Sequence, residues 1–315
     1  MSDRNGGKKH EDGVTRKVRE FYERYHFPGV RPMDMDGLIL MRRMMTFISN
    51  RSHPGAKIRV LDAGCGTGNT VLSLARRFGN VDFLGIDISA PSLSEAKQAA
   101  SDAGLQNLRF RNWNVMTPLQ GEEMFDAILC LGVLHHTADM EYVLFNLGGM
   151  LKDDGELHLW IYGTHGRYRH TLNRRLLAML LDTKEDASDS LPFAKEFVFK
   201  VGQGAIVDDL FGNTSASSKY KKILDDPAWL ADQFLHPNEI VIDMEKLLPL
   251  VARSGLKLDT WHGVADDISK YVHSPDLVAR FNLLPGDQRL IALDLLLKPD
   301  HYFVTLRRSP DQKGG

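Results

Sequence analysis

Apolar residues recur along this chain in two rhythms. Short continuous runs, at 58–61, 82–88 and 125–131, alternate with stretches in which apolar residues return every three or four positions, at 69–78 and 91–103. A continuous apolar run bounded by turn residues predicts a buried strand, and the longer spacing predicts an amphipathic helix. Strands that alternate with helices favour a parallel, doubly wound sheet with helices on both faces.

The alternation extends beyond these segments in both directions. Further strands are predicted at 108–114, 157–162, 256–261 and 301–307. Further helices are predicted at about 14–25, 35–48, 140–151 and 244–254. Pro28 would end the first of these helices, and an Asp153-Asp154-Gly155 turn would stop the third. The stretch between the last two strands is largely helical in pattern.

The rhythm breaks between Gly163 and about Asn238. Helical patches at 168–181 and 193–202 occur there without strands between them. A connection of this length is longer than two neighbouring elements need. We therefore expect a helical insertion at this point and not a second α/β domain.

Composition narrows the classes of protein. The 315 residues carry a net charge of −2 and are 43% hydrophobic, so the chain can bury one large core or two modest ones. A charge near zero disfavours nucleic acid and anionic membranes as partners. No apolar run approaches the roughly 20 residues of a membrane span, and the polar start lacks the apolar segment of a secretory signal. The two cysteines form no metal or disulfide pattern, so a reducing cytoplasm is expected.

The segment VLDAGCGTGNT, residues 60–70, joins the first core strand to a helix. Gly64, Gly66 and Gly68 allow positive φ at this turn and let the backbone approach a ligand closely. Asp62 precedes them. Asp87 ends the next strand, where a carboxylate can accept both hydroxyls of a ribose.

The glycine spacing bears on which nucleotide-like ligand fits. A dinucleotide fingerprint requires G-x-G-x-x-G, but Asn69 stands where its last glycine would be. The acid at Asp62 would repel a pyrophosphate and would attract an ammonium or sulfonium group. A nicotinamide oxidoreductase is therefore disfavoured.

Four segments together resemble a known family. The runs VLDAGCGTGN, FLGIDIS, FDAILCLGVLHH and LKDDGELHLWIY, within residues 57–163, are similar to class I S-adenosylmethionine-dependent methyltransferases. LDTWHG and HYFVTLRR resemble the hairpin that closes this family's sheet. The resemblance implies a seven-stranded, mostly parallel sheet with an antiparallel last strand. It divides the chain into an N-terminal helical extension (1–50), a cofactor-binding Rossmann-like core (51–163), a helical lid insertion (164–240) and the C-terminal part of the core sheet with its own helical insertion (241–315).

The resemblance also implies a set of cofactor contacts. Gly64, Gly66 and Gly68 would line the methionine and ribose of S-adenosylmethionine, and Asp62 would lie near the methionine ammonium. Asp87 would bind the ribose hydroxyls. The remaining expected contacts are Ile88 on the adenine, Asn114 and Val115 at its polar edge, Leu131 beside the cofactor, and Tyr22 at the methionine carboxylate. Asn114 departs from the aspartate that is common at its position.

Two groups of residues are candidates for the chemistry. His135 and His136 follow the fourth strand at the ligand-binding edge of the sheet, and a neutral imidazole can act as a general base near pH 7; turn capping or packing is the alternative. The candidate acceptor contacts are Tyr25, Tyr162, His165, Arg167 and Tyr168, against the alternatives of core packing and a solvated helix start. The group that follows the fifth strand would suit an anionic acceptor. His236, with Trp229 and Phe234, is a weaker candidate for a pocket wall.

The leading hypothesis is methyl transfer to O, N or C of a small metabolite, enclosed by the insertion. A methyltransferase for protein or tRNA is the alternative, although the charge balance counts against RNA. A non-catalytic cofactor-binding protein is a third reading, and the insertion could instead hold a protein or form a homodimer. No metal site is predicted, because no third ligand lies near His135 and His136 in sequence.

Overall fold

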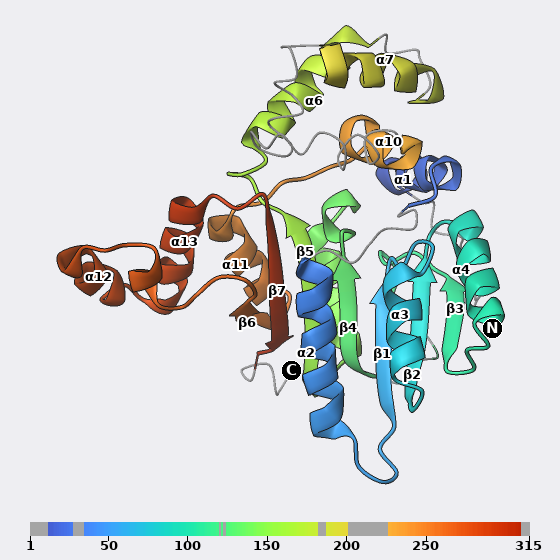
Figure 1. The fold of residues 1–315 in the computed structure, drawn as a ribbon, viewed down its shortest axis with the longest axis horizontal. Coiled ribbons are helices and arrows are strands. Elements are labelled where there is room, and N and C mark those ends of the chain that lie inside the picture. The colour runs from blue at the N-terminus through green and yellow to red at the C-terminus, as the bar shows by residue number, and fades with distance from the viewer. Residues whose placement is uncertain are drawn as a thin grey trace, which may run out of the picture.

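A computed structural model describes residues 12–27, 35–119, 121, 124–181, 187–200 and 226–309. Its centre is a seven-stranded sheet in the order β3-β2-β1-β4-β5-β7-β6 (Figure 1). The strands are β1 (Ile58–Ala63), β2 (Val81–Asp87), β3 (Leu108–Asn112), β4 (Phe125–Leu131), β5 (Leu151–Tyr162), β6 (Leu256–Trp261) and β7 (His301–Arg308). β7 runs antiparallel to both of its neighbours, whereas β1 to β5 pair in parallel. The predicted fold class is confirmed.

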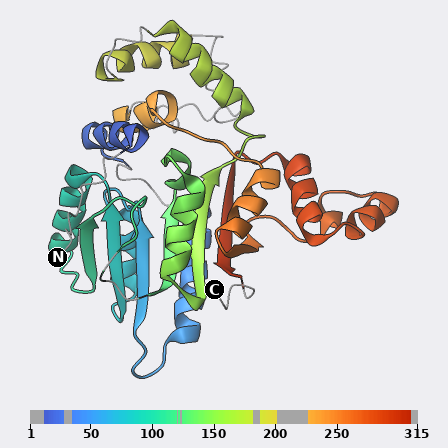
Figure 2. The same ribbon diagram turned by 180° about the vertical axis from the view of Figure 1, so that it is seen from behind.

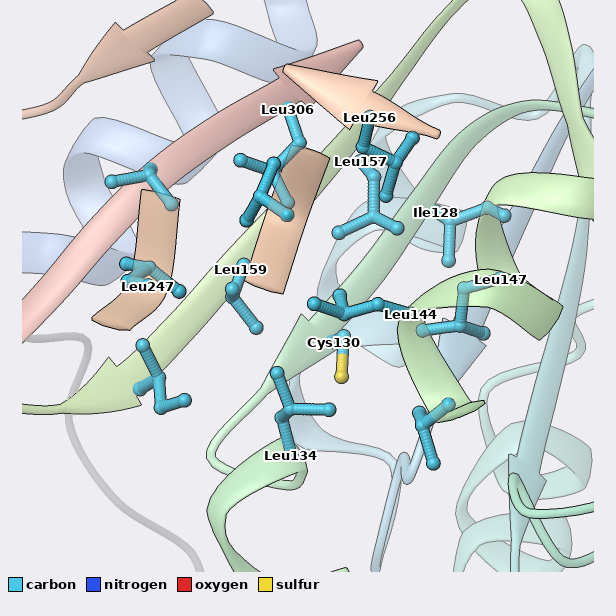
Figure 3. Packing of buried hydrophobic residues seen from close by; sticks show 14 of the residues in the cluster. Ile128, Cys130, Leu134, Leu144, Leu147, Leu157, Leu159, Leu247, Leu256 and Leu306 are labelled. Atoms are coloured by element: carbon cyan, nitrogen blue, oxygen red, sulfur yellow. The ribbon is translucent and has the colours of Figure 1, made fainter. Parts of the chain in front are cut away.

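The continuous apolar strands are explained by helices on both faces of the sheet. Leu61 and Ile128 face α5 (Met140–Met150) and α11 (Met244–Arg253), whereas Val60, Ala127 and Leu129 face the other side. That other side is covered by α2 (Met35–Arg51), α3 (Asn69–Arg77) and α4 (Ala90–Asp102), and all six residues of β1 are buried between the two layers. Figure 2 shows the α5 and α11 side, and Figure 3 shows leucines of that layer packed around Cys130.

A second group of helices lies beyond the carboxyl ends of the strands (Figure 1). We call it the cap, and it comprises α1 (Gly13–Arg24), α6 (Tyr168–Leu180), α7 (Ala187–Lys200) and α10 (Pro227–Leu235). Leu177, Phe197 and Leu230 belong to one apolar cluster of α6, α7 and α10, and Phe21 of α1 packs with Ala231 of α10. The cap therefore has apolar packing of its own, above the edge of the sheet where a ligand is expected.

Two segments differ from the sequence-based expectation. The predicted Asp153-Asp154-Gly155 turn is wrong, because these residues belong to β5, which begins at Leu151. The pairing register with β4 shifts between Phe125 and Ala127, and this irregularity accommodates the polar start of the strand. The second difference is α10, which the sequence pattern did not single out within the insertion.

The chain between β6 and β7 is helical, as predicted. It contains η3 (Ile268–Lys270), α12 (Pro275–Asn282) and α13 (Gly286–Leu297), and η1 (Leu134–His136) follows β4. Within the described ranges, no helix is both long enough and apolar enough to cross a bilayer.

Candidate functional site

A cavity lies between the carboxyl ends of the central strands and helix α1. Its empty volume, which includes space open to solvent at its mouth, is about 1050 Å³. Ten of the residues predicted from the sequence line it: Tyr22, Asp62, Gly64, Gly66, Asp87, Ile88, Asn114, Val115, Leu131 and His136. The cavity therefore gathers residues from α1, from the glycine loop and from the ends of β2, β3 and β4.

The glycine loop requires glycine for conformational and steric reasons. Gly64, Gly66 and Gly68 have φ of +84°, +52° and +83°, a region that side chains with a Cβ rarely adopt. A Cβ on Gly64 would also lie 2.3 Å from Cγ2 of Val133. Gly68 does not line the cavity but precedes the first residue of α3. The backbone can thus line the cavity without side chains in the way.

Asp62 is a buried carboxylate that faces the cavity and has neither a hydrogen-bond donor nor a positive charge beside it among the described residues. It is 3% exposed, and it accepts no hydrogen bond from any residue that the structure describes. Burial, together with the negative charge of Asp87, raises the pKa of Asp62 to about 7. Because a buried carboxylate without a partner is costly, a cationic group in the cavity would stabilise it. The site therefore fits the ammonium of an amino-acid ligand.

Asp87 is oriented by backbone amides. Gly66 N–H donates to its Oδ2 and Ser89 N–H donates to its Oδ1, both at 2.8 Å. Burial raises the pKa of Asp87, and these hydrogen bonds oppose the rise. The carboxylate is thus held at the end of β2, as a ribose-binding acid should be.

Asn114 and Val115 line the cavity after β3. The Asn114 amide oxygen accepts a hydrogen bond from Met116 N–H at 2.9 Å. The amide group is therefore already oriented by its own turn. Trp113 also lines this wall and was not among the predicted contacts, although it stands directly before Asn114 in the sequence.

The two histidines after β4 have different surroundings. His136 lines the cavity, and its Nδ1 is 2.8 Å from the carbonyl oxygen of Asn238. Since a carbonyl only accepts, Nδ1 carries the proton and Nε2 keeps its lone pair. His135 does not line the cavity, and both of its ring nitrogens are buried without a hydrogen-bond partner among the described residues. Its ring centroid lies 4.2 Å from that of Tyr162. Burial lowers the pKa of both imidazoles, so both are neutral.

Tyr22 connects the cavity to the cap. Its hydroxyl donates to Oδ1 of Asp232 on α10 at 2.9 Å, and its carbonyl oxygen accepts from the Ser89 hydroxyl at 3.1 Å. Tyr25, one turn further along, does not line the cavity and packs on Phe21, with ring centroids 5.2 Å apart. Of the two predicted tyrosines, only Tyr22 faces the space where a ligand would lie.

None of the predicted residues that follow β5 lines the cavity. The Arg167 guanidinium is paired with Glu239 at 3.1 Å and stacks 3.4 Å above the Tyr162 ring. His165 lies 3.4 Å from Asp294, and Tyr168 is 61% exposed. Because Glu239 neutralises Arg167, these residues do not present a free cation to an anionic acceptor. Arg167 instead holds the start of α6 against Tyr162 of β5.

A histidine cluster consists of His136, Asp232 and His236. One ring nitrogen or carboxylate oxygen of each lies within 4.8 Å of the others, and all three side chains are buried. Asp232 was not predicted. Its signal in the sequence is the spacing of Asp232 and His236, four residues apart at the end of the mostly apolar run AWLADQFLH, which places both on one side if the run is helical.

The same cluster has residue types that bind divalent metals. The His136 and His236 rings are stacked, however, with centroids 3.7 Å apart and planes inclined by 34°. His236 Nδ1 accepts the N–H of Asn238 at 3.1 Å, so the neutral ring carries its proton on Nε2. A metal bound at both Nε2 atoms would require His236 to change tautomer. The arrangement is that of two neutral imidazoles beside a carboxylate.

Comparison with known proteins bears on the core of the chain. Residues 61–157 match a family described as Methyltransferase domain. The chain is 28% identical to an uncharacterised protein of Synechococcus sp., over 95% of this chain and 73% of that protein. It is 38% identical to the tRNA 5-carboxymethoxyuridine methyltransferase of Escherichia coli (strain K12), over 37% of this chain and 44% of that enzyme.

Among solved structures, PKMT2 from Rickettsia typhi in complex with AdoHcy aligns with 81% of this chain and 49% of its own, with a TM-score of 0.61 and 16% identity. At that identity the likeness concerns the fold. The chain covers less than half the length of the Escherichia coli tRNA methyltransferase and of the Rickettsia typhi PKMT2 chain. The matched family segment runs from the end of β1 into β5 and includes the glycine loop, Asp87 and both histidines.

Proposed function

We propose that this chain, which belongs to the class I S-adenosylmethionine-dependent methyltransferases, transfers a methyl group to an O, N or C nucleophile of a small-molecule metabolite. The observation that carries the proposal is the cavity, which brings the glycine loop, Asp87 and His136 together beneath α1. A concave site with a few convergent polar groups suits a small ligand, and this supports a cofactor together with a small acceptor.

The cofactor is S-adenosylmethionine, and the lining residues fit it. Asp62 would receive its ammonium, Gly64 and Gly66 would lie along the methionine, and Asp87 would accept the ribose hydroxyls. Ile88, Asn114 and Val115 would surround the adenine, with Leu131 beside the ligand. When bound, the cofactor supplies a methyl group on a positively charged sulfur, which is already activated for transfer.

His136 is the better placed of the two candidate bases. Its Nε2 lone pair has no partner among the described residues, and its ring forms part of the cavity wall. A base must come within hydrogen-bond reach of the proton that it removes, which His136 can do and His135 cannot without a rearrangement. We assign His136 the task of accepting the acceptor's proton and His135 a packing role beside Tyr162.

Calorimetry tests the cofactor. The wild-type protein is expected to bind S-adenosylmethionine and not NAD, and Asp87→Ala is expected to weaken that binding at least tenfold. Asp82→Ala, which changes an acid elsewhere on the same strand, serves as the matched control. Equal affinity of wild type and Asp87→Ala would overturn the assignment of this cavity.

The acceptor class is tested separately. Cell extract is incubated with the protein and methyl-labelled cofactor and then fractionated by size, and the label is expected in small molecules. The alternative, a protein or tRNA acceptor, is raised by the tRNA-modifying relative. Label that stays with macromolecules and is released by protease or ribonuclease would establish that alternative instead.

A further inference from the structure

Asp232 is a buried carboxylate whose two oxygens both accept hydrogen bonds. Tyr22 Oη donates to Oδ1 at 2.9 Å, and Gln233 Nε2 donates to Oδ2 at 3.0 Å. The side chain is 2% exposed and forms no ion pair with a lysine or arginine in the described ranges. Burial raises the pKa of Asp232, whereas His136 and the two hydrogen bonds oppose the rise and favour the carboxylate. The carboxylate lacks a lysine or arginine partner among the described residues.

The neighbour best suited to supply the missing positive charge is His136. One of its ring nitrogens lies within 4.8 Å of an Asp232 oxygen. The neutral tautomer of His136 leaves Nε2 free to take a proton, and an adjacent carboxylate favours the protonated form. His236 is excluded from this role, because its Nδ1 already accepts from Asn238 and because His136 and Arg174 add to the effect of burial in lowering its pKa, whereas Asp232 and Glu239 oppose burial at His136.

We propose that Asp232, oriented by Tyr22, is the counter-charge that stabilises His136 when it takes the acceptor's proton, and that the acceptor is a hydroxyl compound methylated on oxygen. This inference rests on the methyl transfer proposed above. Asp232 acts through His136 and is in that sense a positioning residue. It reaches the site from α10, outside the segment that matches the methyltransferase family.

The acceptor class follows from what the proton acceptor is needed for. A neutral amine attacks through its lone pair and can release its extra proton to water afterwards. A hydroxyl group is a weak nucleophile until its proton leaves, so it gains most from a base in contact with it. In the transfer, the O–H bond breaks and its proton goes to His136 Nε2. The oxygen electron pair forms the O–CH3 bond, the pair of the sulfur–carbon bond stays on sulfur, and the imidazolium later returns its proton to solvent.

The charge of the cavity limits the acceptor further. Among the described lining residues the ionisable side chains are acidic, histidine, thiol or phenolic, and none is a lysine or arginine. Arg167 and Arg174, at the start of α6 and within it, are both paired with Glu239. A phosphate or polyanionic group would find no cation on these walls. The proposed acceptor is therefore a hydroxyl compound without a phosphate or other anionic group.

Several groups around His136 set its proton affinity. The neighbouring titratable groups come from four elements and from the segment that follows α10. They are His135 on η1, Tyr22 on α1, Arg174 on α6, Asp232 on α10, and His236 and Glu239 in the segment after α10. Burial and Arg174 favour the neutral ring, whereas Asp232 and Glu239 favour the charged ring. Glu239 is already neutralised by two arginines, which leaves Asp232 as the unpaired negative charge.

The test is an NMR titration of the His136 ring in the protein without cofactor. In Asp232→Asn, the pKa of His136 is expected to fall by about one unit or more relative to wild type. Asp232→Glu, which keeps the charge, should restore most of the difference. Glu196→Gln, which removes an exposed carboxylate from α7 of the cap, should leave the His136 pKa unchanged. An unchanged pKa in folded Asp232→Asn would overturn the proposal.

Two further measurements keep the outcome clear. In the wild-type protein, which needs no substitution to fold, the neutral His136 ring should carry its proton on Nδ1, and the opposite tautomer would overturn the role of Nε2. The labelled product should show an O–CH3 carbon resonance, and an N- or C-methyl resonance would overturn the hydroxyl assignment. Failure of the wild-type protein to bind S-adenosylmethionine would instead refute the proposed function, whatever His136 does.

Discussion

At the scale of single residues, the cavity is built from groups that are costly without a ligand. Three glycines adopt positive φ, and Asp62 is buried without a hydrogen-bond partner among the described residues. Features of this kind persist when a function requires them. They make Gly64 and Asp62 two positions at which substitution should change both ligand binding and stability, in the same direction at Gly64 and in opposite directions at Asp62.

Gly64→Ala should lower both stability and cofactor affinity. Its Cβ would require a left-handed conformation, which costs roughly 1–2 kcal/mol, and would overlap Val133, whose branched side chain has few alternative rotamers. Denaturant unfolding and calorimetry measure the two effects. Gly79→Ala, where a Cβ meets nothing within 4 Å, is the matched control and should be neutral. Wild-type stability of Gly64→Ala would contradict this account of the loop.

Asp62→Asn should stabilise the protein without cofactor at neutral pH. The pKa of Asp62 is about 7 in the fold against 3.8 when unperturbed. The folded state therefore holds a proton that the unfolded state loses, and wild-type stability falls as pH rises between these values. Asn removes that loss, so the variant should gain about 2–4 kcal/mol at pH 7.5 and nothing below pH 4. The free energy of unfolding measured across this pH range should show the divergence, while cofactor affinity falls. Parallel pH profiles for the two proteins would refute the raised pKa.

At the scale of elements, α2 is anchored to the sheet by a charged contact at its first turn. Asp36 accepts from Trp160 Nε1 and from His301 Nε2, both at 2.8 Å, and His301 Nδ1 lies 2.7 Å from Asp300. Burial opposes the charge on His301, but the hydrogen bonds and charges of Asp300 and Asp36 outweigh it and raise its pKa to about 9. One titrating ring thus joins α2, β5 and β7.

This contact should weaken in alkaline solution. A histidine whose pKa is raised in the fold contributes stability fully below pH 6.5, and that contribution is lost as pH rises through about 9. Because the side chain is 31% exposed, solvent screening limits the effect to about 1 kcal/mol. His301→Gln should remove this part of the pH dependence of unfolding. His53→Gln, in the exposed loop before β1, should not. If both variants retain the wild-type profile, the contact does not carry the effect.

Some of these elements could be predicted from the sequence alone and others could not. The pattern of apolar runs placed the central strands β1, β2 and β4 because they are covered on both faces, and a local pattern records such burial. The turn predicted at Asp153 to Gly155 was wrong because glycine and aspartate also occur in irregular strands. Glycine is needed at position 155 for packing, since a Cβ there would lie 2.8 Å from the Leu151 side chain. The role of Arg167 was not readable, since its partner Glu239 is distant in sequence. Asp232 was missed for the same reason.

At the scale of the whole molecule, the cap and the sheet have separate apolar interiors. Leu177 is fully buried in the cluster of α6, α7 and α10, and Leu159 is fully buried in the cluster beneath the sheet. The two regions are joined through polar contacts such as Gln233 Nε2 to the Tyr162 hydroxyl at 2.9 Å and the Ser89 hydroxyl to the Tyr22 carbonyl at 3.1 Å. We therefore expect the cap to open at a lower free energy than that of global unfolding.

A matched pair of substitutions tests this expectation. Leu177→Ala and Leu159→Ala each remove a fully buried leucine side chain, at a cost of about 2–5 kcal/mol. Hydrogen exchange should show faster exchange confined to the cap in Leu177→Ala. In Leu159→Ala it should show faster exchange in the sheet strands. Equal acceleration throughout the molecule in both variants would indicate a single cooperative unit.

The position of Tyr22 has a consequence for the timing of turnover. Its carbonyl oxygen is bonded to Ser89, beside the acid at the end of β2, and its hydroxyl is bonded to Asp232 in the cap. Under the proposed function, a spent cofactor that leaves past α1 would have to break both attachments, and a small methylated product that leaves elsewhere would not. Release of the two products would then be ordered, with the methylated compound first. The departure of the demethylated cofactor would then set the pace of the cycle.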